Sequence, residues 1–272
     1  MAANKLSLKE ERQLERLKLI DLCAYVLGYV NRSLLTSRFD IESAYASRDI
    51  KKYQEESLNK LTYNTSLKAY EPVSWFEPLY MHSFEEAFTL ISEGSQKISF
   101  IPKLSESKAV ISISGIEPDL QIVAPVLRAV SRGIKVEIDY ISTTSGKTKR
   151  LIAPHSLLSA GNFKYVRAFD HKSGEFRTFK LNRIIHAKLT NWKVESEMQK
   201  KSDSDWNENT TLTLVANRLL KHKEAIEFDY GLTNGKKEIQ IKKALIPFFM
   251  MDWNIADKNQ NLPPKQFPLE RL

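Results

Sequence analysis

The sequence predicts an α+β protein of several modules: a helical amino-terminal part, a small β-barrel and a mixed α/β part at the carboxyl end. Three observations predict this class. Apolar residues recur at helical spacing through residues 11–53, short alternating runs separated by glycine turns fill residues 136–184, and residues 211–272 mix both patterns. A chain of 272 residues also exceeds the usual domain size of about 100 to 150 residues, so two or three domains are expected.

The first 80 residues predict three helices followed by a β-hairpin. An amphipathic helix covers residues 11–27, and the side-chain oxygen of Asn31 or Ser33 can cap a second, short helix. A third helix covers about residues 42–53. The sequence L-T-Y-N-T-S-L-K-A-Y then predicts two short strands around residues 64–66.

The predicted third helix has two different faces. Ala46, Ile50 and Tyr53 follow a packing stripe, whereas small polar and cationic side chains remain outward. These outward side chains are Ser43, Ser47, Arg48, Lys51 and Lys52. Two helices joined by a short turn, the second with such a face, are typical of the helix-turn-helix that reads bases in the major groove of DNA. In the hairpin, which would form a wing, the candidate contacts to the DNA backbone are Lys60, Tyr63 and Lys68.

The charge distribution separates the modules. Residues 1–80 carry 12 Lys and Arg against 11 Asp and Glu, so a plain three-helix packing unit with a polar surface remains an alternative there. Residues 121–200 carry 15 against 6, which favours an anionic ligand or nucleic acid at that module. A basic surface that is only solvated is the alternative for this second segment.

The alternating runs between residues 136 and 184 predict strands of a barrel. The four runs are residues 136–141, 150–155, 164–170 and 176–184. In the third run Val166 and Ala168 fall on one face, and Arg167 falls on the other between the rings of Tyr165 and Phe169. A guanidinium so placed can offer its planar fork to a phosphate or carboxylate. The alternative for Arg167 is a structural ion pair, for which the two candidate partners are Asp139 and Glu137.

The order of residues along these runs resembles the WYL domain, an Sm-like (SH3-like) β-barrel of bacterial transcription regulators. The resemblance is carried by Tyr140, Arg150, Pro154-His155, Tyr165-Val166-Arg167-Ala168, Phe179 and Arg183-Ile184. The triplet that names the domain aligns with Lys164-Tyr165-Val166, so that a lysine replaces the tryptophan and a valine the leucine. The resemblance implies an effector pocket lined by Tyr140, Ser142, Arg150, His155, Tyr165, Arg167, Phe179 and Arg183. For His155, a satisfied turn histidine is the alternative.

The amino-terminal module also resembles a known type. The order F-D-I-x-x-x-x-A-S-R-D-I-x-x-Y from Phe39 to Tyr53, followed by L-x-Y-N and K-A-Y, is similar to the winged helix of WYL regulators associated with bacterial anti-phage defence systems such as BREX and CBASS. The resemblance implies a winged helix-turn-helix DNA-binding domain in residues 1–80 and a ligand-sensing WYL barrel in residues 121–194. It also implies a small α/β extension in residues 206–272 that helps dimerisation.

Between and after these modules the patterns are weaker. Residues 81–120 predict a connector that contains a helix at residues 84–91 and a strand at residues 110–113, and a helix at residues 122–131 leads into the barrel. The polar residues 195–210 are typical of a linker. In the last module the pattern predicts a strand at residues 211–215, a helix or turn at residues 217–223 and a hairpin turn at Asn234-Gly235. The sequence A-I-E-F-D-Y-G-L, residues 225–232, lies before the hairpin turn.

The sequence offers little for catalysis or metal binding. Its one cysteine, Cys23, excludes an internal disulfide, and its five histidines lack the spacing of metal ligands. We therefore predict no catalytic residue, no metal and no cofactor. The longest late apolar run, residues 244–251, is far shorter than the roughly 20 residues of a membrane span, and we expect a cytoplasmic protein without membrane contact.

These observations together predict a homodimeric, sequence-specific transcription regulator. We expect a repressor of a phage-defence operon that binds an inverted-repeat operator in double-stranded DNA and senses a nucleotide or nucleic-acid effector at the barrel. An activator would use the same residues. A protein of another class, an RNA or single-stranded nucleic-acid binding module that uses the basic barrel, is the alternative function. The operator and the effector stay open.

Overall fold

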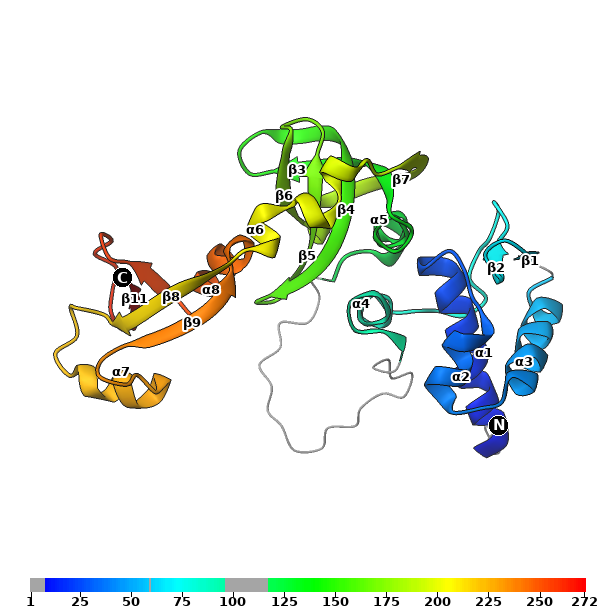
Figure 1. The fold of residues 1–272 in the computed structure, drawn as a ribbon, viewed down its shortest axis with the longest axis horizontal. Helices are drawn as coiled ribbons and strands as arrows, with labels where there is room; N and C mark the ends of the chain where they lie inside the picture. Colours follow the sequence, from blue (N-terminus) through cyan, green and yellow to red (C-terminus); the bar gives the residue numbers. More distant parts are fainter. Residues whose placement is uncertain (1–7, 59, 96–116) are drawn as a thin grey trace, which may run out of the picture. The chain divides into compact units, whose positions relative to one another are not determined.

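The computed structural model describes residues 8–58, 60–95 and 117–272, and these divide into two compact units (Figure 1). The first unit comprises Met1–Leu158 and Lys164–Val194, and the second comprises Ser159–Phe163 and Glu195–Leu272. The strand predicted at residues 110–113 lies outside the described residues. Among those that are described, no helix is long and apolar enough to cross a membrane.

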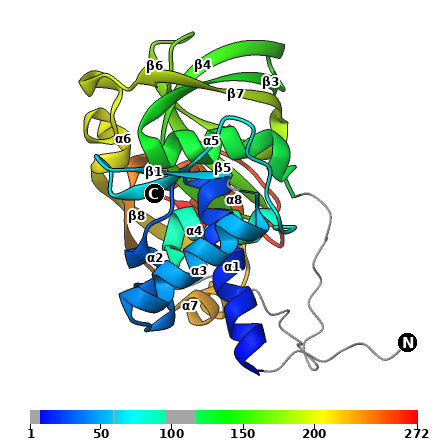
Figure 2. The ribbon, with the colours of Figure 1, turned by 90° about the vertical axis from the view of Figure 1, so that its right-hand side faces the viewer.

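Three helices and a hairpin open the first unit (Figure 2). The helices are α1 (Leu8–Val26), α2 (Arg32–Phe39) and α3 (Ser43–Glu56), and the hairpin pairs β1 (Leu61–Asn64) with β2 (Ala69–Pro72) in antiparallel register. Asn31, and not Ser33, caps α2, because its Oδ1 accepts the amide of Leu34 at 3.0 Å. The predicted helices and wing are confirmed, although α3 continues about one turn beyond Tyr53.

The core of these helices follows the predicted stripe. Ala46, Ile50 and Tyr53 of α3 are fully buried against apolar residues of α1. Burial extends to Asp49 on the same face, which the periodicity did not predict. The Asp49 carboxylate receives hydrogen bonds from Arg16 at 2.6 Å and Gln13 at 3.0 Å, so α1 neutralises the charge that α3 buries.

Two further helices belong to both cores of the first unit. Helix α4 (Phe84–Glu93) directs Phe84 and Phe88 into the barrel core but Ala87 and Leu90 into the helical core. Helix α5 (Leu120–Arg132) likewise buries Leu127 in the helical core and Val123, Val126 and Ala129 in the barrel core. The helix predicted at residues 84–91 of the connector thus occurs as α4, and it contributes side chains to both cores.

The barrel module is a five-stranded antiparallel sheet in the order β6-β5-β4-β3-β7 (Figure 1). Its strands are β3 (Ile134–Ser142), β4 (Gly146–Ala160), β5 (Phe163–Asp170), β6 (Glu175–Lys180) and β7 (Ile184–Lys193). The prediction of one strand at residues 176–184 is wrong. Leu181–Arg183 form a 3-10 turn that buries Leu181, and a fifth strand, β7, begins after it and pairs with β3.

The second unit begins with the residues predicted as a linker, and that prediction is also wrong. Two 3-10 turns, Ser196–Met198 and Lys200–Ser202, lead to the short helix α6 (Ser204–Asn207). Trp206 is only 7% exposed, and the side chain of Asp203 caps its amide. A buried tryptophan and a capped turn are features of folded structure, which the polar composition of the segment concealed.

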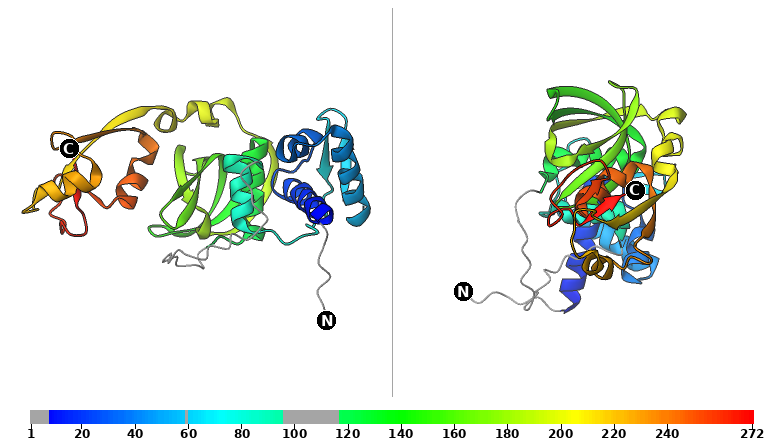
Figure 3. Two further views of the ribbon diagram at one scale, coloured as in Figure 1. Left: turned by 90° about the horizontal axis from the view of Figure 1, so that it is seen from below. Right: turned by 90° about the vertical axis from the view of Figure 1, so that its left-hand side faces the viewer.

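A four-stranded sheet in the order β10-β11-β8-β9 forms the rest of the second unit (Figure 3). Its elements are β8 (Asn209–Ala216), α7 (Lys223–Tyr230), β9 (Lys237–Lys242), a 3-10 turn at Lys243–Leu245, α8 (Ile246–Asp252), β10 (Ile255–Asp257) and β11 (Leu269–Arg271). The predicted turn at Asn234-Gly235 is confirmed. Both residues have positive φ angles, 53° and 73°, and the bridge between Thr233 and Lys236 closes the turn.

Candidate nucleic-acid interface and ligand site

Helix α3 presents an exposed polar face. Ser43, Arg48 and Lys51 are exposed, whereas Ser47 and Lys52 are half-buried. The hydroxyl of Ser47 donates to the carbonyl of Ser43 at 2.9 Å, which occupies its proton within the helix. The predicted face thus exists, but its members differ in how freely they can reach a partner.

Arg48 is the best placed cation on this face. Its guanidinium lies over the ring of Tyr45, 4.2 Å from the centroid, and its Nε makes a long contact of 3.5 Å to the carbonyl of Ala44. Its two terminal nitrogens make no hydrogen bond with any described residue. Tyr45 is itself 51% exposed, so the stacked pair stands out from the helix with a free fork of donors. The i, i+3 spacing of Tyr45 and Arg48 was the available signal for this pair in the sequence.

The two lysines of the face have intramolecular partners. Lys51 lies 4.0 Å from Glu55, and Lys52 lies 3.7 Å from Glu56, each one turn further along α3. The ammonium of Lys52 also donates to Gln13 of α1 at 2.9 Å. These neighbours offset part of the positive charge, so each lysine has less to offer a phosphate than Arg48 has.

The wing carries two of the three remaining predicted residues of the interface, and the third, Lys60, precedes β1 and donates to the carbonyl of Glu77 at 3.3 Å. Tyr63 on β1 is 50% exposed, and its ring centroid is 5.0 Å from that of Tyr70 on β2. Lys68 is exposed at the turn, where its φ angle of 50° is left-handed. Asn64 organises the same turn, since its Oδ1 accepts the amides of Ser66 and Leu67 at 3.0 and 3.1 Å.

A hollow of about 590 Å³ lies beside the start of α3. Its lining includes Lys9, Arg12 and Arg16 of α1 together with Glu42 and Tyr45. Lys9 and Arg12 are exposed cations next to the polar face, and sequence analysis missed them because they belong to a different helix. Only the packing of α1 against α3 brings them to this place.

In the barrel, one face of β5 gathers part of the predicted ligand site. Arg167 is 6% exposed and donates from Nη1 to Thr178 of β6, its register partner, at 3.4 Å. On the same face Phe169 packs edge-to-face on Phe176, with centroids 5.3 Å apart, and Phe176 contacts the ring of His155 at 5.7 Å. Thr178 and Phe176 did not stand out in the sequence. Arg167, Phe169 and His155 are therefore brought together, as the alternation of the third run implied for the first two.

A lysine lies beside Tyr165 on this face. The ammonium of its register partner Lys180 lies 5.6 Å from the centre of the Tyr165 ring. Burial, and after it the nearby charge of Arg183, lower the pKa of Lys180 below its usual value. Cations that crowd one another in this way are stabilised by an anion.

Three other predicted ligand residues point to the opposite, inner side of the sheet. Tyr140 and Phe179 belong to the barrel core and meet edge-to-face at 5.2 Å. Arg150 forms an ion pair with the fully buried Asp170 and donates to Thr148 at 3.1 Å. The structure thus gives Arg150 an internal role, with Asp170 as a partner that sequence analysis did not name.

The last two predicted ligand residues lie in turns of the barrel. The hydroxyl of Ser142 accepts the amide of Thr144 at 3.2 Å and so caps the hairpin between β3 and β4. Arg183 is half-buried in the 3-10 turn before β7. Of the eight predicted residues, the face that carries Arg167 therefore holds His155, Tyr165 and Arg167.

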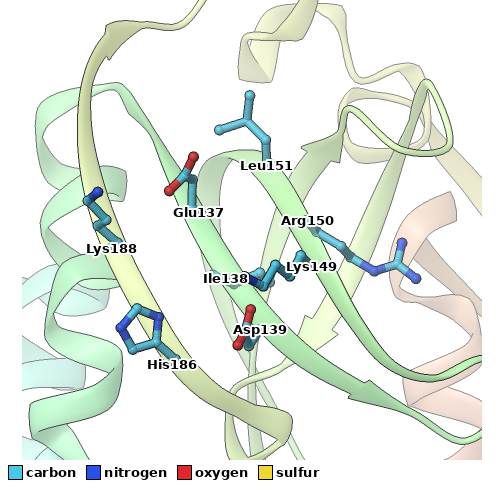
Figure 4. Close-up of a pocket in the computed structure, with 8 residues that line it drawn as sticks. All are labelled: Glu137, Ile138, Asp139, Lys149, Arg150, Leu151, His186 and Lys188. Carbon is cyan, nitrogen blue, oxygen red and sulfur yellow. The ribbon is translucent and has the colours of Figure 1, made fainter.

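A separate hollow of about 630 Å³ lies on the sheet where β3 runs between β4 and β7 (Figure 4). Its polar lining comes from Glu137, Asp139, Lys149, His186 and Lys188. In Figure 4 the guanidinium of Arg150 points away from this group. Acids alternate here with bases on neighbouring strands, so the hollow has no single sign of charge with which to select an ion.

Comparison with known proteins assigns all three modules. The family models that match are the BrxR transcriptional regulator winged helix-turn-helix domain at residues 12–93, the WYL domain at residues 121–189 and the BrxR transcriptional regulator C-terminal dimerization domain at residues 209–271.

The chain is also similar over nearly its full length to curated proteins named DNA-binding transcriptional repressor CapW. The protein from Escherichia coli strain KTE188 is 29% identical over 265 residues, which cover 94% of this chain and 88% of that protein. The one from Pseudomonas aeruginosa is 28% identical with the same coverage, and the one from Stenotrophomonas maltophilia is 27% identical over 89% of this chain and 83% of that protein. The chain therefore contains, in this order, a BrxR-type winged helix-turn-helix domain, a WYL domain and a BrxR-type C-terminal dimerization domain.

Proposed function

We propose that this protein is a DNA-binding transcriptional repressor of a phage-defence operon, that it acts as a homodimer, and that an anionic ligand at the WYL domain controls its DNA binding. The observation that carries the proposal is the combination of an exposed, cation-bearing α3 with a wing, in a chain that also holds the WYL and dimerization domains. The similarity to proteins named DNA-binding transcriptional repressor CapW supports repression instead of activation. The domain division proposed is residues 1–80, 81–120, 121–194 and 206–272.

For DNA, α3 enters the major groove and the wing contacts the backbone. Arg48 reads base edges, because its stacked guanidinium has free terminal donors that match the acceptors of guanine. Ser43, Ser47, Lys51 and Lys52 surround it, with Lys51 and Lys52 as weaker phosphate contacts. Tyr63 and Lys68 hold the adjacent backbone from the exposed wing.

For the ligand, the face of β5 that carries Arg167 is the proposed contact surface. Its cations and rings suit a phosphate attached to a base, such as a nucleotide or a nucleic-acid fragment. His155, Tyr165 and Arg167 contact the ligand directly. Tyr140, Arg150 and Phe179 support the strand from the core side, and Ser142 and Arg183 border the site.

For the dimer, the second unit offers exposed apolar side chains. Phe228 on α7 is 89% exposed, and the described residues of α7 and α8 contain no fully buried side chain. Exposed aromatic rings of this kind are typical of protein–protein contacts. A second copy of the chain is the proposed partner, in line with the dimerization domain that matches this segment.

The test is fluorescence anisotropy of the purified protein on the duplex upstream of its own gene. A shuffled duplex and the matching single strand serve as controls, at about 0.15 M salt. Tight binding to the native duplex alone supports the repressor. Equal binding to all three, or a preference for the single strand, supports instead the RNA or single-strand binding module that the excess charge of residues 121–200 favours.

A further inference from the structure

Helix α5 of the barrel module meets the end of α1 at Gly28. The φ angle of Gly28 is +79°, and a Cβ at this position would lie 3.2 Å from the Cδ atoms of both Arg128 and Arg132. Arg128 donates from Nη2 to the carbonyl of Tyr25 in the last turn of α1, where a cation is favourable. A side chain here would be strained by the positive φ angle and would require both arginines of α5 to shift by a few tenths of an ångström.

From α5 a continuous chain of hydrogen bonds reaches the turn of the wing. Arg132 Nη2 lies 2.7 Å from Glu71 Oε1 on β2, and Glu71 Oε2 accepts from Asn64 Nδ2 at 2.8 Å. The Oδ1 of Asn64 in turn accepts the amides of Ser66 and Leu67 in the wing turn. The side chains of Arg132, Glu71 and Asn64 therefore connect α5 of the WYL domain with the wing turn that carries Lys68.

In the other direction, α5 packs on β7 and β3 and shares a core with β5, the strand that carries the ligand face. Val123 and Val126 of α5 lie in the same core cluster as Val166 and Ala168 of β5. Val166 and Ala168 alternate with Arg167, so a displacement of Arg167 moves side chains in the core that α5 completes.

The junction is not fully satisfied electrostatically. The Nε of Arg128 is buried and has no hydrogen-bond partner among the described residues. Burial, and then the charge of Arg132, lower the pKa of Arg128. Glu71 offsets this positive charge, and without it the two arginines would face each other across the glycine with less compensation.

We infer that Glu71 and Arg132 are positioning residues through which α5 of the WYL domain sets the wing in its DNA-binding position. Neither is a DNA contact in the proposed interface. The inference rests on the proposed function, because it explains how a change in the barrel alters DNA affinity.

The decisive variant is Glu71→Gln in the full chain, because its two possible effects have opposite signs. Removal of a carboxylate from a DNA-binding surface by itself strengthens binding to a polyanion. Loss of the wing position weakens it. We expect weaker binding to the upstream duplex by roughly three-fold or more, the size of a partly exposed ion pair that is lost. Unchanged or tighter binding overturns the inference.

A second variant shows whether the loss passes through the wing. Lys68→Gln removes the wing cation, and Glu71→Gln added to it is expected to cause little further loss, whereas two full, additive losses overturn the inference. Glu175→Gln is the matched control, since Glu175 pairs with Arg177 at 3.0 Å on the surface of β6. Thermal unfolding of each variant reports on folding.

If Glu71→Gln lowers the melting temperature, Arg132→Gln breaks the same bond from α5. As a single variant, Arg132→Gln is then expected to lower DNA affinity as much as Glu71→Gln does. Added to Glu71→Gln, it is expected to cause no additional loss. Separate, additive losses overturn the inference. A wild-type protein that does not prefer the duplex removes the proposed function itself, and this inference with it.

Discussion

Asp21 Oδ2 and His82 Nε2 lie 2.7 Å apart inside the helical core, although 61 residues separate them in the chain. The same fully buried carboxylate accepts hydrogen bonds from the hydroxyl of Tyr53 and from the amides of Leu79 and Tyr80, at 2.8 and 3.0 Å for the amides. Burial and the charge of Asp21 raise the pKa of Tyr53 far above its usual range, which keeps its hydroxyl protonated as a donor. One carboxylate thus joins α1, α3 and the segment before α4.

We expect Asp21→Asn to destabilise the first unit by roughly 2 to 4 kcal/mol, because an amide replaces an acceptor oxygen with a donor among buried donors. Urea unfolding followed by circular dichroism measures the loss. Asp40→Asn is the matched control, since Asp40 is exposed at the end of α2 in a left-handed conformation that asparagine tolerates. Equal stability of the two variants would argue against Asp21 as a structural centre.

Arg48→Ala is expected to weaken binding to the upstream duplex by about 1 to 3 kcal/mol and to relax its sequence preference, as for an arginine that reads a base. Lys51→Ala should cost less and act equally on native and shuffled duplexes, because Glu55 already offsets part of its charge. Anisotropy titrations at several salt concentrations distinguish the two. An unchanged affinity in Arg48→Ala would remove this residue from the interface.

Arg167→Ala is expected to keep operator binding but to lose induction, because the ligand loses its main cationic contact. A reporter behind the upstream promoter, read before and after phage infection, should remain repressed in both states. Arg177→Ala, which removes an exposed arginine of β6, should respond as the wild type does. If Arg167→Ala melts at a markedly lower temperature than Arg177→Ala, the guanidinium has a structural role and the ligand site loses its main support.

Arg150→Met is expected to destabilise the first unit by roughly 3 to 5 kcal/mol, because it leaves the fully buried Asp170 without its cation. Arg177→Met breaks the exposed pair with Glu175 and should cost less than about 1 kcal/mol. Differential scanning calorimetry compares the two. A mild effect of Arg150→Met combined with lost induction would assign Arg150 to the ligand instead of the core.

Phe228→Asp is expected to weaken self-association at least about ten-fold, since an exposed ring in a dimer contact is commonly worth more than 1 kcal/mol. Sedimentation equilibrium measures the dissociation constant. Glu238→Ala, an exposed change on β9, provides the control within the same unit. A dimer of unchanged strength in Phe228→Asp would place the contact elsewhere.

The sequence by itself determined the elements whose signals are local. The stripe of Ala46, Ile50 and Tyr53 and the turn at Asn234-Gly235 each depend on residues a few positions apart, and each occurs as predicted. For the cap of α2 the sequence left Asn31 and Ser33 open, and the structure selects Asn31. The order of residues along the barrel likewise indicated its family. Helical and strand periodicity indicate which side chains share a face, and this information is present in the sequence alone.

Only the tertiary structure determined which side chains from different helices and strands contact one another. The pairing of Arg150 with Asp170, the burial of Asp21 among donors up to 61 residues away and the division of α4 between two cores depend on how the faces pack together. The alternation within β5 predicted which of its side chains share a face, but not which residues of β3, β4 and β6 lie on the same face. The reason is that a 3-10 turn at Leu181–Arg183 and an irregular register between β3 and β7 interrupt the alternation. The physical reason is that periodicity fixes direction along one element, whereas contacts between elements are set by the packing of the whole core.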